Sequence, residues 1–118
     1  MQNGVAFARN EIELRNDLEA LAPQIKARII VSAGHIHNYE RFDRNGVTFL
    51  VSGGGAASPV DVERASDDLY QNKEFPNYHF VEFELHGDTL EGKMYRLADA
   101  NAETPTWELK DSFKISTK

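Results

Sequence analysis

Two histidines separated by a single residue stand at positions 35 and 37, in the string GHIHNYER. They follow the apolar run RIIVSA (residues 28–33), which is typical of a buried strand. Neutral imidazole is a common ligand of borderline transition metals such as zinc. Two imidazoles at this spacing can bind one ion or, if a turn separates the rings, two neighbouring ions. His35 and His37 are therefore candidate metal ligands, with Gly34 expected to let the backbone turn sharply away from the strand.

The spacing alone leaves simpler readings open, because a pair of loop histidines without any ligand has the same pattern. Gly53–Gly55 could bind phosphate through backbone N–H groups, but a tight turn is the favoured interpretation, because no helix start or lysine follows as in a P-loop. His79 shares a strand face with apolar residues, which predicts a packed histidine, and His86 beside a turn is expected to be exposed. A solvated acidic face without EF-hand spacing is expected at Asp61, Glu63, Asp67 and Asp68.

Hydrophobic periodicity predicts one α/β (α+β) domain over residues 1–118. Its expected order is one N-terminal helix, two buried strands and an antiparallel β meander. The helix is expected over residues 10–22, where leucines recur at helical spacing to form an apolar stripe. Asn10 and Glu13 have the pattern of a capping box, and Pro23 is expected to end the helix.

The two buried strands are expected at residues 28–33 and 46–52, and the first reads as parallel. The polar segment HNYERFDRN between them predicts a loop ending in the turn Asn45-Gly46. In the last forty residues, alternating side chains around the turn Gly87-Asp88 predict the meander. In its final strand, one face is expected to carry Trp107, Leu109, Phe113 and Ile115, interrupted only by Asp111.

Composition excludes several classes of function. The formal net charge of −6 argues against nucleic acid as a main partner, which would require a basic surface. No stretch approaches the roughly 18 consecutive apolar residues of a membrane span, so no membrane partner is expected. The chain has no cysteine, which excludes both disulfides and a thiolate zinc site.

The segment IIVSAGHIHNYERF (residues 29–42) resembles the last block of the calcineurin-like metallophosphoesterases, a G-H-x-H box at the end of a buried strand. The continuation N-Y-E-R is most similar to the purple acid phosphatase branch, where GHxHxYER is typical. The likeness extends over about residues 10–116, but only the GHIHNYER string is specific. The implied fold is the C-terminal part of a metallophosphoesterase-type sandwich.

The resemblance implies that His35 ligates one metal ion and His37 its neighbour, in a dinuclear site of divalent or trivalent ions of the Fe, Zn or Mn type. It implies hydrolysis of a phosphate ester by a metal-activated hydroxide. Arg41 also matches the string; it could contact substrate, but a structural salt bridge explains it equally well.

This sequence departs from the family in one respect. The earlier blocks D-x-H, G-D-x-x-D/Y and G-N-H-D/E do not precede His35, and residues 1–34 contain no histidine and a single aspartate, Asp17. Two neutral imidazoles cannot hold a dinuclear centre without a bridging carboxylate. We therefore expect residues 1–118 to be a C-terminal fragment that needs the missing N-terminal part of the domain. By itself the chain is expected to be inactive and to self-associate through uncovered apolar surface.

Two other functions remain open from the sequence. One is a non-catalytic interaction module that retains a phosphatase-like scaffold. The other is a mononuclear metal-binding domain that uses His35, His37 and an acidic residue. Metal titration distinguishes them, because the first binds no specific ion and the second binds one stoichiometrically.

Overall fold

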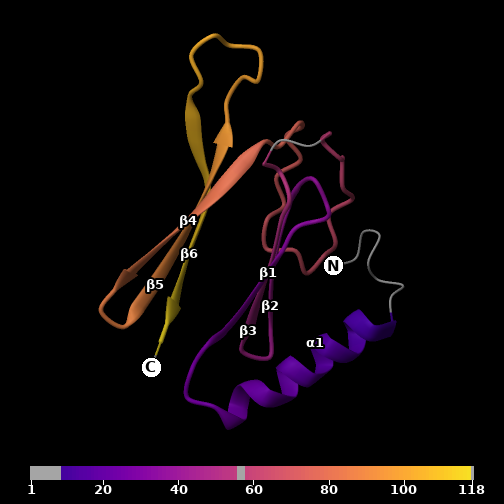
Figure 1. The fold of residues 1–118 in the computed structure, drawn as a ribbon, viewed down its shortest axis with the longest axis vertical. Helices are drawn as coiled ribbons and strands as arrows, with labels where there is room; N and C mark the ends of the chain where they lie inside the picture. The colour runs from indigo at the N-terminus through magenta and orange to yellow at the C-terminus, as the bar shows by residue number, and fades with distance from the viewer. Residues whose placement is uncertain (1–8, 56–57, 118) are drawn as a thin grey trace.

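The computed structural model describes residues 9–55 and 58–117, and the side chains from residue 12 onward. The chain forms a small α+β fold of one N-terminal helix, a mixed three-stranded sheet and an antiparallel three-stranded meander (Figure 1). This confirms the predicted class. No helix in the described part has the length and apolar character needed to cross a bilayer. The elements are α1 (Arg9–Leu21), the 3₁₀ turn η1 (Ala22–Gln24), β1 (Ile29–Ala33), β2 (Tyr39–Arg44), β3 (Val47–Ser52), β4 (His79–His86), β5 (Thr89–Leu97) and β6 (Trp107–Ser116).

Helix α1 lies where the leucine spacing predicts it. It ends at Leu21, and Pro23 stands in the 3₁₀ turn that follows, as expected. The capping box involves Asn10, whose side chain lies outside the described part. The apolar stripe is only partly buried: Leu18 packs against the first sheet, whereas Leu14 is exposed.

The first sheet has the strand order β1-β3-β2, with β1 parallel and β2 antiparallel to β3. The pairing of β1 confirms the predicted parallel strand. The loop predicted between the two apolar runs is wrong, because Tyr39–Arg44 forms β2 and pairs with β3 through the turn at Asn45-Gly46. Its polar residues are accommodated because the strand lies between two layers that offer partners. β1 is half-buried rather than buried, and its last residues, Ser32 and Ala33, are exposed.

The first sheet is the middle of three layers. On one face, Phe42, Val47 and Phe49 pack against Leu18 and Ala22 of the helical segment. On the other face, a cluster of Tyr39, Leu50, Tyr70 and Met94 joins the first sheet to the meander. The strands on either side of the GHIHN segment are thereby fixed by packing on both faces.

The meander has the order β4-β5-β6, and the turn at Gly87-Asp88 is confirmed. The expectation that Trp107, Leu109, Phe113 and Ile115 share one face of β6 is wrong. A register shift at Met94/Tyr95 pairs Met94 with Asp111 and Tyr95 with Leu109, so the strand contains a β-bulge. As a result Leu109 is exposed, and Asp111 points inward.

Apolar surface remains exposed on several described elements. Trp107 does not fill the core, because it is 46% exposed and contacts Phe80 edge to face. Other large exposed apolar side chains are Ile12, Leu14, Leu21, Ile25, Val60, Leu69, Phe75, Phe80, Phe83, Leu85 and Leu109.

Candidate functional site

The predicted ligands lie in a tight connection between β1 and β2. A hydrogen bond of 3.0 Å from Ile36 N to Gly34 O closes a γ-turn around His35, whose φ is +76°. A second bond of 2.8 Å runs from Asn38 N to Ile36 O around His37. The expectation that Gly34 makes the sharp turn is wrong, because the left-handed residue is His35 itself. Such strain in a non-glycine residue concentrates at functional sites.

The positive φ of His35 allows a direct test of whether the backbone is strained at this residue. The side chain is exposed, so its removal costs little packing. We expect His35→Gly to be more stable than His35→Ala by about 1 kcal/mol, because glycine adopts positive φ without steric cost. Urea denaturation measures the difference. An alanine variant as stable as the glycine variant would show that the turn at this residue carries no strain.

The ring of His37 is oriented by the segment that follows the glycines. Its Nδ1 lies 2.6 Å from the carbonyl oxygen of Ser58. A carbonyl only accepts hydrogen bonds, so Nδ1 is the donor, and in the neutral ring Nε2 keeps its lone pair. The backbone of His37 is held as well, because its carbonyl accepts a bond of 3.2 Å from Val60 N. An imidazole that donates one N–H to a carbonyl and offers the other nitrogen is the usual state of a metal ligand.

The glycines after β3 serve close packing around this loop. A Cβ on Gly53 would lie 2.1 Å from Ile36 O, and one on Gly54 would lie 2.3 Å from His79 Nδ1. The N–H of Gly53 donates to Asn38 O at 3.1 Å, so it is engaged within the protein. Gly55 has no such neighbour within 4 Å. These contacts support the tight-turn interpretation rather than a phosphate cradle.

His79 is packed, as the sequence predicts. It is 4% exposed; its Nε2 lies 2.9 Å from Ser52 Oγ and its Nδ1 lies 2.9 Å from Asn77 O. Burial lowers the pKa of His79 below its ordinary value, and the nearby charge of Arg64 acts in the same direction. Its ring also contacts Tyr39 edge to face at 5.4 Å. Both ring nitrogens are used internally, so this histidine is a structural neighbour of the loop.

Arg41, the third candidate, forms a bidentate pair with Asp111. The distances are 2.8 Å from Nε and 3.1 Å from Nη2 to the two carboxylate oxygens. The same carboxylate accepts a bond of 2.7 Å from the Tyr39 hydroxyl. Burial, together with the Asp111 charge, raises the pKa of Tyr39, so the phenol remains a donor. Arg41 therefore has a structural role between the sheets, and a contact with substrate stays a prediction.

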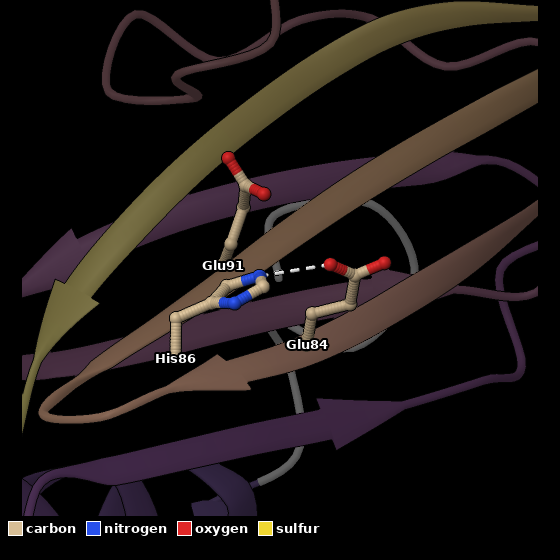
Figure 2. Close-up of side chains that lie close together, drawn as sticks. All are labelled: Glu84, His86 and Glu91. Carbon is tan, nitrogen blue, oxygen red and sulfur yellow. Dashed lines mark hydrogen bonds and ion pairs between the residues drawn. The ribbon is translucent and has the colours of Figure 1, made fainter.

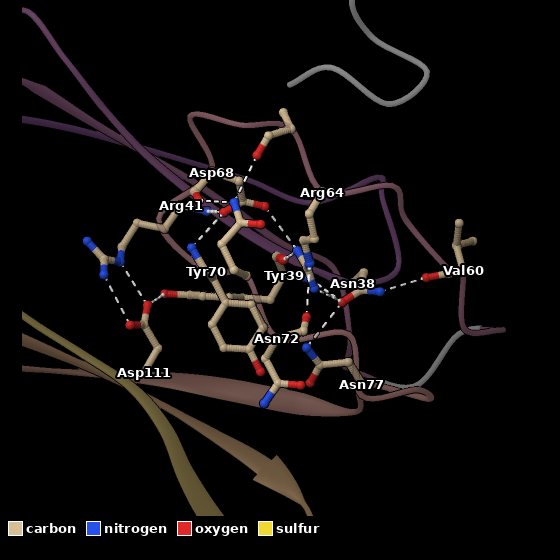
Figure 3. Close-up of polar contacts among 12 residues, drawn as sticks. Asn38, Tyr39, Arg41, Val60, Arg64, Asp68, Tyr70, Asn72, Asn77 and Asp111 are labelled. Atoms are coloured by element: carbon tan, nitrogen blue, oxygen red, sulfur yellow. Dashed lines mark hydrogen bonds and ion pairs between the residues drawn. The ribbon is translucent and has the colours of Figure 1, made fainter.

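A second buried network of hydrogen bonds holds the long connection from β3 to β4 (Figure 3). The sequence patterns did not predict this network. The Arg64 side chain is 2% exposed and pairs at 3.1 Å with Asp68, whose side chain is fully buried. Arg64 also donates to Asn38 Oδ1 and to the carbonyl oxygens of Tyr39 and Asn72. The solvated face expected around Asp68 is thus wrong for this residue. The only indication of this ion pair in the sequence was the i, i+4 spacing of Arg64 and Asp68.

The described residues do not complete a metal site around the two predicted ligands. In residues 9–55 and 58–117, one group of three or more His, Asp or Glu has all its ligand atoms within 4.8 Å of one another. That group is Glu84, His86 and Glu91 on the meander, and it contains neither His35 nor His37. The two predicted ligands therefore have no acidic third partner at that distance within the described part.

Comparison of this chain with protein families, with curated proteins and with solved structures found no match. The resemblance to metallophosphoesterases therefore depends on the GHIHNYER string alone and stays a prediction.

Proposed function

We propose that this chain contributes His35 and His37 to the dinuclear metal centre of a phosphate-ester hydrolase of the metallophosphoesterase type. The observation that carries the proposal is the contact of 2.6 Å between His37 Nδ1 and the Ser58 carbonyl oxygen, which in the neutral ring leaves the Nε2 lone pair for a metal ion. The γ-turn at His35 supports it, because a strained, exposed histidine contributes little to folding.

The residues present fit only part of such a centre. Two neutral imidazoles supply no negative charge, and no carboxylate joins them within the described residues. The remaining ligands would then come from another segment of the protein. When bound, the metal ions would stabilise the negative charge that develops during phosphoryl transfer. The part of this chain is to hold two ligands in fixed orientation at the carboxyl end of β1.

The phosphoesterase activity of this chain by itself tests directly whether the two histidines need further metal ligands. We expect no hydrolysis of a chromogenic phosphate ester above the rate with Zn²⁺, Mn²⁺ or Fe³⁺ alone, because the bridging carboxylate is missing. Hydrolysis that depends on the protein and disappears in His37→Gln would contradict the proposed need for further ligands.

Metal titration separates this proposal from the alternatives. It is best performed in a His86→Gln background, because the exposed imidazole of His86 can bind ions by itself. We expect weak Zn²⁺ binding that is lost in His37→Gln and reduced in His35→Gly. No loss in either variant would favour the interaction module, and tight stoichiometric binding would favour the mononuclear domain. The expected self-association stays a prediction, which sedimentation at high concentration tests.

A further inference from the structure

The outer face of the β4–β5 hairpin carries a second group of ligand-type side chains (Figure 2). Glu84, His86 and Glu91 present ligand atoms that all lie within 4.8 Å of one another. His86 Nε2 and Glu84 Oε2 are 2.8 Å apart. This group lies on the meander, whereas the predicted ligands of the proposed phosphoesterase site lie between β1 and β2.

Strand geometry fixes these three side chains on one face. Glu84 and His86 are two residues apart on β4 and therefore point to the same side. Glu91 is the direct cross-strand partner of Glu84 in the register. A two-residue turn follows His86 and contains Gly87 at φ +59°. This tight turn fixes the pairing of β4 with β5 at the end of the hairpin. The arrangement therefore needs no movement of the backbone to bring the three groups together.

The local charge favours a cation. Two carboxylates directly opposite each other on neighbouring strands repel and destabilise the pairing. Lys93 partly compensates, since its Nζ lies 3.4 Å from Glu91 Oε1. One positive charge against two carboxylates still leaves the group net negative.

We propose that Glu84, His86 and Glu91 bind a divalent ion of the borderline transition-metal class, such as Zn²⁺, on the surface of the hairpin. One imidazole and two carboxylates form a donor set that zinc accepts, and open sites with three protein ligands leave a position for water. A purely oxygen-binding ion such as Ca²⁺ would not use the imidazole. The ion would replace the hydrogen bond between His86 Nε2 and Glu84, and Nδ1 of the neutral ring would then carry the proton.

Lys93 makes the proposal specific, because it competes with the ion for Glu91. The ammonium group must leave Glu91 for this carboxylate to bind metal with full charge. Removing Lys93 is therefore expected to tighten binding, whereas an isolated surface histidine would not respond in this way.

The test is a Zn²⁺ titration of the 118-residue chain, followed through the ring resonances of His86 in a ¹H–¹⁵N spectrum. Four exposed or half-exposed positions are changed, and circular dichroism verifies the fold of each variant. We expect His86→Gln to abolish binding at this site, and Glu84→Gln and Glu91→Gln each to weaken it by roughly tenfold or more. Lys93→Ala is expected to tighten it.

Two outcomes would overturn the proposal. If Glu84→Gln and Glu91→Gln leave the affinity unchanged, the ion makes an adventitious single-histidine contact only. If the His86 resonances do not respond to Zn²⁺, the group binds no such ion. Neither outcome affects the proposed role of His35 and His37, whose resonances are separate.

Discussion

Replacing Arg64 with methionine is expected to lower the free energy of unfolding by about 3–5 kcal/mol, because it leaves a fully buried carboxylate, Asp68, without its cation. The guanidinium group also stacks 4.9 Å from the Tyr70 ring centroid and donates to backbone carbonyls. Methionine fills a similar volume, so the loss would reflect the charge and the hydrogen bonds rather than a cavity. Urea denaturation monitored by circular dichroism measures it.

The matched control also removes the negative charge of Asp68, which Arg64 balances. Asp68→Asn keeps an oxygen able to accept the bonds from Arg41 N at 3.1 Å and from Tyr70 N at 2.9 Å. We expect the double variant Arg64→Met/Asp68→Asn to recover part of the stability lost by Arg64→Met alone. If Arg64→Met lies within 0.5 kcal/mol of the wild type (roughly the effect of an ordinary surface substitution), the network does not stabilise the connection.

Asp111→Ala is expected to cost about 2–4 kcal/mol of stability. The carboxylate accepts bonds from both Arg41 nitrogens and from the buried Tyr39 hydroxyl, and alanine leaves all three donors without it. The range is below that of a fully buried pair because the Arg41 and Asp111 side chains are 15% and 10% exposed. The loss should appear as a lower midpoint in thermal and urea unfolding.

Tyr39→Phe separates the contribution of the Tyr39 hydroxyl from that of the Arg41–Asp111 ion pair. It removes one donor and leaves the Arg41–Asp111 pair in place, so we expect a cost of about 1 kcal/mol. Asp111→Asn should fall between the two, because an amide cannot accept a bidentate guanidinium with both arms. An Asp111→Ala variant no less stable than Tyr39→Phe would contradict the inferred contribution of the ion pair.

Regular elements of this chain could be predicted because short-range patterns determine them. The leucine spacing of α1, the β-branched run of β1 and the Gly87-Asp88 turn each define a local structure with one dominant solution. The parallel pairing of β1 with β3 followed from its continuous apolar run.

The remaining features depend on partners far along the chain. β2 contains the sequence YERFDR, which predicts a loop because charged residues are mostly exposed to solvent. In the fold, Arg41 instead reaches Asp111, seventy positions away. The β-bulge opposite Met94/Tyr95 directs Asp111 inward, and alternation alone would have placed it with Leu109. A polar residue that interrupts an apolar face was the available signal.

The candidate site was predicted in part. The spacing of His35 and His37 identified the loop, but it could not show that His35 itself takes the left-handed conformation. Nor could it show that Ser58, twenty-one positions later, would orient the ring of His37. The second feature depends on a segment that is distant in the sequence and adjacent in the fold. The Glu84–His86–Glu91 group likewise becomes visible only when the register of β4 and β5 is known.

The central claim is that His35 and His37 act together as metal ligands, and ring-nitrogen NMR of ¹⁵N-histidine protein tests it most directly. Before metal is added, we predict a protonated Nδ1 and an unprotonated Nε2 in His37. On addition of Zn²⁺, the Nε2 of His37 and a ring nitrogen of His35 should shift with the same dependence on metal concentration. A protonated Nε2 in His37, or resonances of both residues that do not change while His86 responds, would contradict the account.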